Sequence, residues 1–359
     1  MKKLAAGALL ALLLVALCLP AGAVMNKYST MYLDSFDTVI TLIGYAESEE
    51  TFNEQADQVH EMFLYMHKLF DTYNSYEDEG IVSIFTLNER AAQEPVAVDP
   101  ILFSLLTFCK ANYALCHEQV NVAMGSVLSI WHEYREAGLA DPEHAQLPPM
   151  EALEAASGHM NIDDLVLDEE NMTVYFADPQ LRLDVGAVAK GYATELISQM
   201  LLAGPMPSFI ISAGGNVRCG QKPLDGRARW GVSIQDPGPA DGLPGTGYMD
   251  VLYLTNLSVV TSGDYQRYYT VDGVRYHHLI DPDTLYPGRH MRAVTIVTQD
   301  SGLADALSTA VFLMPYEQGR AFVEALDGVE AYWVLLDGSV QCTDGLRAML
   351  ASQGASSRD

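Results

Sequence analysis

Two adjacent histidines, His277 and His278, stand just before an Asp-Pro turn in the stretch RYHHLIDPDT. A histidine side chain can act as a general base near neutral pH or bind a metal through a ring nitrogen. On a strand, consecutive side chains point to opposite faces, so this pair is poorly placed to bind one metal together. One histidine is therefore a candidate for chemistry, and a purely structural role for both stays open.

The residues upstream of the histidines predict a β-hairpin. Asp272 and Gly273 lie between two runs of alternating polar and apolar residues, which is the strongest short-range signal for a two-residue turn. Such a turn determines the register of the two strands. The predicted partners are Val271 with Val274, Tyr269 with Tyr276, and Arg267 with His278.

A second candidate lies in SGLADALSTAVFLM, residues 301–314, which the small and apolar residues predict to be helical. Asp305 and Thr309 are four residues apart, so a carboxylate and a hydroxyl share one helix face. Both supply hard oxygen atoms, which suit Mg²⁺ or Ca²⁺ better than zinc. The alternative is that Asp305 only favours the first helical turn and Thr309 only packs.

A third candidate is LRLDVGAVAKGYATELI, residues 181–197, which predicts a strand, a glycine turn and a helix. Asp184 ends the strand and Lys190 lies in the first helical turn, where a phosphate group would be favoured. The spacing matches neither a Walker loop nor a dinucleotide fingerprint, and a plain connection remains possible. Glycines also interrupt FIISAGGNVRCG (209–220), where backbone could approach a ligand closely.

The elements that must position these groups mix strands and helices without regular alternation, which favours an α+β fold with mixed or antiparallel sheets and packed helices. Pro/Gly-rich connections at 138–150 and 236–247 interrupt the chain, the first being a possible subdivision, and residues 351–359 are expected to be a flexible tail. The predicted strands are 32–45, 174–177, 181–185, 208–212 and 230–235, and the predicted helices are 51–70, 100–117 (started by Asp99-Pro100), 188–203 and 301–314.

Composition narrows the possible functions. The 359 residues include 47 Asp+Glu against 20 Lys+Arg, a net charge of −27, which would repel a nucleic acid. Apolar residues make up 49% of the chain, enough for a sizeable core.

The first residues predict export. Lys2 and Lys3 precede a short apolar run and an Ala-Gly-Ala site, so residues 1–23 are expected to be a signal peptide cleaved after Ala23. Cys18 leaves a lipoprotein, and with it membrane association, as the alternative. Cys109, Cys116, Cys219 and Cys342 follow no disulfide framework or zinc spacing, and we expect isolated buried thiols.

Taken together, these segments resemble the ApbE family, the FAD:protein FMN transferases. The similarity rests on five motifs in order: LDVGAVAKGYA, ISAGGNVR, VVTSGDYQRYY, YHHLIDPDT and LADALSTAVF. Weaker similarities precede them, at residues 29–31, 70–88 and 120–131. The resemblance implies one ApbE-like domain over 24–350, with a ligand cleft between subdomains.

The resemblance also implies an activity. Members of the family bind FAD and Mg²⁺, transfer FMN through a phosphoester to a threonine of a target redox protein, and release AMP. Expected acceptors include flavin-carrying subunits of membrane redox pumps, and the expected location is the periplasm or the extracytoplasmic face of the cell membrane.

Residue by residue, the resemblance assigns His278 as the general base that deprotonates the threonine, and it leaves Tyr73 or Tyr76 as candidates to stack on the flavin. The metal ligands would be Asp305, Thr309 and the backbone carbonyl of Ala187. The contacts to FAD would come from Met31, Ala123, Met124, Gly125, Asp184, Lys190, His278 and Ile280.

Two departures from the family pattern bear on this interpretation. Leu285 stands where the family has glycine, which is costly if the turn needs a positive φ. The segment after Tyr73 is also divergent. Two other functions remain open: an FAD pyrophosphatase that releases FMN and AMP to water, and a non-catalytic exported flavin-binding protein.

Overall fold

The computed structural model of the protein describes residues 24–239, 245 and 247–358. The predicted signal peptide and Cys18 therefore lie outside the described residues. Within the described ranges, no helix is long and apolar enough to cross a membrane.

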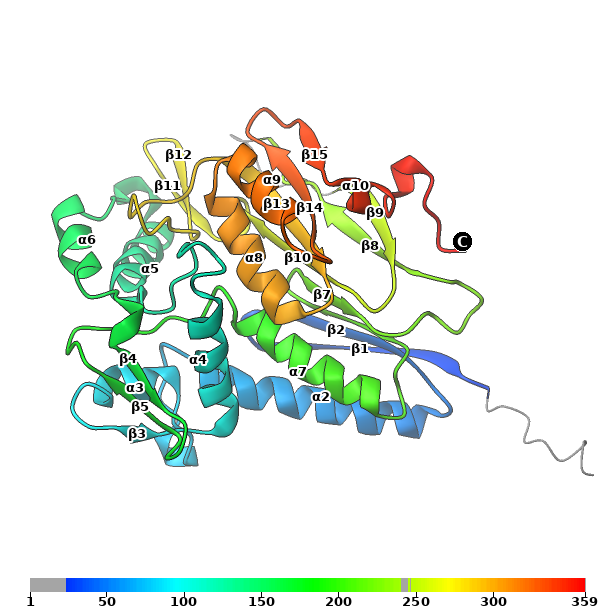
Figure 1. Ribbon diagram of the computed structural model, residues 1–359, viewed down its shortest axis with the longest axis horizontal. Helices are drawn as coiled ribbons and strands as arrows, with labels where there is room; N and C mark the ends of the chain where they lie inside the picture. Colours follow the sequence, from blue (N-terminus) through cyan, green and yellow to red (C-terminus); the bar gives the residue numbers. More distant parts are fainter. Residues whose placement is uncertain (1–23, 240–244, 246, 359) are drawn as a thin grey trace, which may run out of the picture.

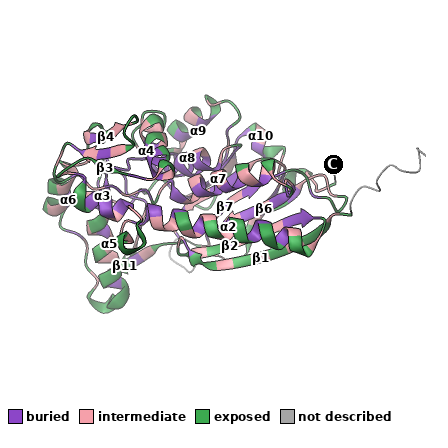
Figure 2. Ribbon diagram, turned by 90° about the horizontal axis from the view of Figure 1, so that it is seen from below, coloured by how far each residue is buried: buried purple, intermediate pink, exposed green. Residues whose placement is uncertain are grey.

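A mixed α/β architecture is built on one large antiparallel sheet (Figure 1). Neighbouring strands in this sheet are joined by antiparallel ladders throughout. Its edge strand β1 is largely exposed along its length (Figure 2). In spatial order the strands are β1 (Asn26–Ser35), β2 (Thr38–Ala46), β6 (Phe209–Ala213), β7 (Asn216–Cys219), β10 (Ser258–Gly263), β13 (Met291–Thr298), β14 (Glu330–Leu335) and β15 (Val340–Cys342).

Helices cover one face of this sheet and bury the main hydrophobic core. The apolar residues of α2 (Glu49–Phe70) recur at helical spacing, so the buried side of this helix packs on the sheet and its polar side faces outward (Figure 2). The helices of this layer are α2 (Glu49–Phe70), α4 (Pro100–Asn112), α7 (Ala189–Ala203), α8 (Ser301–Leu313) and α9 (Tyr316–Glu324).

A second core lies on the opposite face of the sheet, where a hairpin and the C-terminal segment cover it. Strand β13 is buried along its whole length because its alternate side chains enter the two cores. This layer contains β8 (Trp230–Gln235), β9 (Tyr248–Leu254), α10 (Asp344–Arg347) and the short η4 (Ala351–Gln353).

Two smaller units stand at one end of the sheet. The first has its own core around Trp131 and Tyr269, and contains α5 (Gly125–Ala140), η2 (Pro142–His144), α6 (Met150–Ser157), β11 (Tyr268–Val271) and β12 (Val274–His277). The second contains η1 (Glu77–Glu79), α3 (Ile84–Arg90), β3 (Val96–Ala97), η3 (Ile162–Asp164), β4 (Leu165–Asp168) and β5 (Thr173–Phe176).

The helices predicted at 51–70, 188–203 and 301–314 are confirmed to within two residues. The helix predicted to begin after Asp99 does so, with the Asp99 carboxylate accepting the N–H of Ile101 at 2.7 Å. It ends at Asn112 and not at residue 117. Turns follow the helix, and His117 and Glu118 have a positive φ that an α-helix does not allow.

The single strand predicted at 32–45 is wrong, since the chain forms β1, a turn and β2. The turn residues Phe36 and Asp37 have φ of 54° and 50°, a conformation that sequence patterns usually mark with glycine or asparagine. The turn is held from outside, because the N–H of Phe36 donates to Nδ1 of His67 at 3.2 Å.

The strand predicted at 181–185 is also absent. The Asn88 side chain occupies the position a neighbouring strand would take, donating to Leu183 O at 3.0 Å and accepting the Leu183 N–H at 2.7 Å. Only an isolated bridge joins Arg182 to Met124. The strands predicted at 174–177, 208–212 and 230–235 form, with their ends shifted by at most one residue.

The connection at 138–150 and the C-terminal tail both pack against the rest of the structure. In the connection 138–150, Gly138 lies against Tyr269, whose hydroxyl donates to Gln146 O at 3.0 Å. The expected flexible tail instead forms η4, and the N–H of Ala228 donates to Ser357 O at 2.7 Å. The C-terminal residues up to 358 therefore belong to the folded unit.

Gly125 provides a test of this packing. A Cβ on Gly125 would lie 2.6 Å from the carbonyl oxygen of Arg182, which is closer than real Cβ atoms approach backbone. We expect Gly125→Ala to lower the free energy of unfolding by about 1–3 kcal/mol, measured by urea denaturation. Gly158→Ala is the matched control, because Gly158 has helical φ and its nearest contact would be 3.4 Å. Equal stability of the two variants would contradict the prediction.

Candidate functional site

A cleft of about 970 Å³ opens between the end of the large sheet and the unit formed by α5, α6 and the β11–β12 hairpin. This confirms the expected cleft between subdomains. The turns β1–β2 and β6–β7 and the end of β10 meet at this end of the sheet. Its lining includes eight predicted site residues: Met124, Asp184, Ala187, Lys190, His278, Ile280, Asp305 and Thr309.

Three predicted flavin contacts do not line the cleft. Met31 is 63% exposed on edge strand β1, and the turn that follows, 36–38, reaches the cleft instead. Ala123 is fully buried, with its N–H donating to Asn121 Oδ1 at 2.9 Å. Gly125 is required for close packing on Arg182. The last two support the loop that presents Met124, and the structure gives Met31 no place at the site.

Helices α7 and α8 meet at one corner of the cleft. The N–H of Gly191 donates to Asp305 Oδ2 at 2.8 Å, and a Cβ on Gly191 would lie 2.4 Å from the Ser301 carbonyl oxygen. The glycine therefore allows the two helices to approach closely. Thr309 lies one turn beyond Asp305 on α8, with its hydroxyl 3.4 Å from that of Ser262.

The oxygen atoms at this corner fit a hard divalent cation. Asp305 is 5% exposed, and burial raises the pKa of its carboxyl group, since a carboxylate removed from water is costly unless a cation compensates it. Thr309 adds a hydroxyl, and Ala187, which lines the same cleft, has a backbone carbonyl that could add a third oxygen. No group of three His, Cys, Asp or Glu residues suited to a metal occurs among the described residues.

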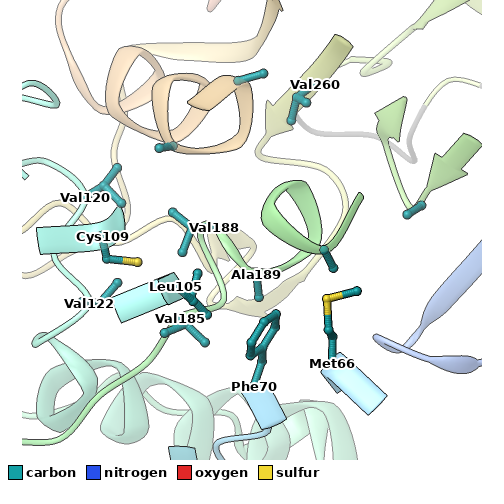
Figure 3. Close-up of a cluster of buried hydrophobic side chains, with 14 of the residues drawn as sticks. Met66, Phe70, Leu105, Cys109, Val120, Val122, Val185, Val188, Ala189 and Val260 are labelled. Atoms are coloured by element: carbon teal, nitrogen blue, oxygen red, sulfur yellow. The ribbon is translucent and has the colours of Figure 1, made fainter. Parts of the chain in front are cut away.

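The turn 184–190 rests on an apolar floor. Figure 3 shows Val185, Val188 and Ala189 among buried side chains from α2 and α4, including Phe70 and Leu105. Above this floor, Asp184 Oδ1 accepts the N–H of Gly186 at 2.8 Å, which holds the turn in shape. Burial raises the pKa of the Asp184 carboxyl group.

The side chains of the two histidines lie in different surroundings, as expected for consecutive residues at the end of a strand. The hairpin pairs Tyr269 with Tyr276 and Val271 with Val274, and the N–H of His278 donates to Arg267 O. His277 is buried, and both its nitrogens are satisfied: Nε2 donates to Gly288 O at 2.7 Å and Nδ1 accepts the Leu279 N–H at 3.2 Å. His277 is structural.

His278 has one nitrogen left for chemistry. Its Nδ1 lies 3.2 Å from Arg267 O, and a carbonyl can only accept, so the proton belongs on Nδ1. The unprotonated Nε2 has no hydrogen bond from any described residue. Burial, and then the positive charge of Arg267, hold the pKa of His278 well below its usual value. The ring is therefore neutral at pH 7, as a base must be.

One wall of the cleft is formed by α5 and was not predicted from the sequence. This wall contains residues 124, 128, 131, 132, 135 and 139. Their helical spacing is visible in the sequence and could have indicated a shared helix face. The ring of His132 stacks on Tyr73 with centroids 4.4 Å apart. Arg135 donates to His132 Nδ1 at 2.8 Å, and burial followed by this charge lowers the pKa of His132.

Tyr73, one of the two tyrosines considered for stacking on the flavin, lines the cleft, and Tyr76 does not. Asp71 arranges this loop: its carboxylate accepts the N–H groups of Tyr73 and Asn74 and the hydroxyl of Tyr76. The pKa of Asp71 is lowered by these hydrogen bonds against the opposing effect of burial.

Leu285, which stands where the family pattern has glycine, has a positive φ of 60°. This conformation costs a residue with a Cβ about 1–2 kcal/mol. Burial offsets the cost, because Leu285 is 7% exposed in the core around Trp131, whose Nε1 donates to Leu285 O at 2.9 Å. The loop after His278 is thus retained with a different residue.

The four cysteines in the described chain are free and buried, as expected. Burial raises the pKa of the Cys109, Cys116 and Cys219 thiols, which keeps them protonated and unreactive.

The pH dependence of stability tests the role of His277. Burial lowers its pKa to about 4, whereas the unfolded chain takes up this proton near pH 6.5. Its contribution to stability is therefore present above pH 6.5 and is lost as pH falls towards 4, by about 3 kcal/mol at most. We expect His277→Gln to be less stable than wild type at pH 7.5, with a difference that shrinks at pH 4.5 in thermal denaturation. A constant difference would refute this role.

Comparison with known proteins agrees with this geometry. The model of the ApbE family matches residues 24–333. A protein from Treponema pallidum named FAD:protein FMN transferase is 33% identical over 275 residues, 74% of each chain. One of that name from Klebsiella pneumoniae is 28% identical, over 76% of this chain and 84% of its own.

Solved structures show the same fold. The ApbE protein from Thermotoga maritima superposes with a TM-score of 0.77 at 28% identity, over 90% of this chain and 99% of its own. The flavin transferase ApbE from Vibrio cholerae gives a TM-score of 0.73 at 20% identity, over 91% of this chain and all of its own. The sequence motifs, the cleft and these matches together place the chain in the ApbE family.

Proposed function

We propose that this protein is a Mg²⁺-dependent FAD:protein FMN transferase that attaches FMN to a threonine of a redox protein and releases AMP. The observation that supports the proposal most directly is the content of one cleft. It combines a histidine with an available Nε2, the cationic side chains of Lys190 and Arg267, and the buried Asp305–Thr309 pair. The names of the relatives give the activity, and the cleft has the groups to perform it.

Asp305, Thr309 and the carbonyl of Ala187 would hold the Mg²⁺ ion. When bound, the ion would neutralise charge on the pyrophosphate of FAD. Lys190, in the first turn of α7, adds a positive charge to the same corner, where its field lowers the pKa of Asp305 and partly opposes the effect of burial. Lys190 thus supplies positive charge beside the proposed metal ligand in a chain whose net charge is −27.

His278 would accept the proton of the threonine hydroxyl at Nε2. Arg267 O retains the other ring proton on Nδ1, so the ring presents its lone pair to the cleft. Asp281 holds the turn that follows, its carboxylate accepting the N–H of Asp283 at 2.8 Å and that of Thr284 at 3.3 Å. This arrangement orients a base and requires no proton relay.

Two other functions use the same site differently. An FAD pyrophosphatase would let water attack in place of threonine. A non-catalytic flavin-binding protein would need neither the oriented base nor the metal corner, so the His278 and Asp305 geometry argues against it. We also propose that the protein acts outside the cytoplasm, on the basis of residues 1–23, with lipidation of Cys18 as the alternative to cleavage after Ala23.

One assay separates these three functions. The protein is incubated with FAD, Mg²⁺ and a redox protein carrying an acceptor threonine, and a threonine-to-alanine form of the acceptor serves as the control. We expect flavin fluorescence on the acceptor band of a denaturing gel, one AMP per flavin, and loss of both on chelation. Free FMN with AMP would indicate a pyrophosphatase, and intact FAD a binding protein. An unchanged Mg²⁺ titration in Asp305→Ala would refute the proposed metal corner.

Replacing the base should stop transfer without removing FAD. We expect His278→Ala to lower kcat for flavin transfer by about 10²–10⁴-fold, with the Kd for FAD changed little, as measured by flavin fluorescence. His290→Ala is the control, because His290 is exposed and outside the cleft lining. Undiminished transfer by the His278 variant would remove this residue from the mechanism.

A further inference from the structure

Arg267 supplies a positive charge to the cleft that no ion pair with a described residue neutralises. Its side chain is exposed, lines the cleft, and makes no hydrogen bond or ion pair with any described residue. Other arginines nearby are engaged: Arg135 contacts His132 and Glu136, and Arg292 contacts Asp264. In a chain with 47 acidic residues, the guanidinium group of Arg267 forms no ion pair with a described residue and is available for a ligand anion.

The backbone of Arg267 is tied to the proposed base. Its carbonyl oxygen accepts the N–H of His278 at 3.0 Å and also the Nδ1 proton of the same residue at 3.2 Å. The hairpin that follows is in regular register from Tyr268 to His277. The guanidinium group and the imidazole ring therefore extend from two residues whose backbones are hydrogen-bonded to each other.

The charge of Arg267 acts on the groups around it. Among charged groups, Arg267 has the largest effect on His278, and it also lowers the pKa values of Asp184 and Tyr73, against larger increases from burial. These residues come from three separate segments of the cleft wall. Arg267 and these three residues all line the same cleft.

We propose that Arg267 is a further catalytic residue, which binds the phosphoryl oxygens of the FMN group while it passes to the acceptor hydroxyl. This inference rests on the proposed function. The threonine oxygen bonds to the FMN phosphorus, its proton passes to Nε2 of His278, and the bond from that phosphorus to the bridging oxygen breaks. AMP leaves with the bridging oxygen and the electron pair of the broken bond.

Arginine suits this task better than the lysine already in the site. The planar guanidinium group donates two parallel N–H bonds to two oxygens of one phosphoryl group, whereas an ammonium group is a point charge. Arg267 stands beside the base, where the entering hydroxyl would add its charge.

The test compares Arg267→Gln and Arg267→Ala with wild type, and Lys27→Gln is the control for charge. Lys27 is exposed on β1, outside the cleft, and the substitution changes the net charge equally. We expect both Arg267 variants to keep their thermal stability and to lose on the order of 10²-fold in kcat for flavin transfer. The KM for the acceptor protein should be unchanged, and the control should match wild type.

Chemical rescue sharpens the test. Guanidinium chloride at millimolar concentration should restore part of the activity of Arg267→Ala, and sodium chloride at equal ionic strength should not. Full activity in either variant, equal rescue by sodium chloride, or a rise in acceptor KM at unchanged kcat would overturn the inference. The last result would make Arg267 a contact to the acceptor protein. A wild-type protein that leaves FAD intact would overturn the proposed function itself, which distinguishes that failure from this one.

Discussion

The close contact between Gly191 and Asp305 is the constraint on which the site depends. It brings the first turn of α7 against the first turns of α8, and Ala187, just before α7, lines the same cleft as the carboxylate and hydroxyl of the second helix. Any side chain at position 191 would push the helices apart, since it would meet backbone at 2.4 Å. The oxygen atoms of the corner are therefore positioned by packing in the interior, and the surrounding loops add charge and shape.

Electrostatics constrains how an anionic ligand can bind in the cleft. A protein of net charge −27 repels anions at long range, and a dinucleotide must reach its site against that field. Screening over about 8 Å at physiological salt confines this outer repulsion to short distances. The lining combines the cations of Arg135, Lys190 and Arg267 with the carboxyl groups of Asp37, Asp71, Glu136, Asp184 and Asp305. An anionic group in the cleft therefore depends on the placement of individual cationic side chains and not on a net positive lining.

Sequence patterns correctly predicted the features that depend on the spacing of neighbouring residues. The Asp-Gly turn gave the register around His278, and the i, i+4 rule placed Asp305 and Thr309 on one face of α8. Patterns failed where tertiary contacts replace local signals. The turn at Phe36–Asp37 has no glycine and is held by His67, so local patterns predict a continuous strand there. The resemblance assigns a flavin contact to Met31, whereas the turn 36–38 lines the cleft. The segment at 181–185 pairs with the Asn88 side chain, a partner 95 residues away that no local pattern can reveal.

The β11–β12 hairpin has a consequence for how the protein can adapt. His278 and Arg267 lie at the same end of the ribbon, where the N–H of His278 donates to Arg267 O, and the opposite end, at Asp272 and Gly273, is exposed. This hydrogen bond joins the backbone of the two residues, so their relative position does not depend on the tip. Lengthening or recharging the exposed tip would alter which macromolecules can approach, with the reacting groups left in place. Acceptor choice and chemistry can thus diverge independently in evolution.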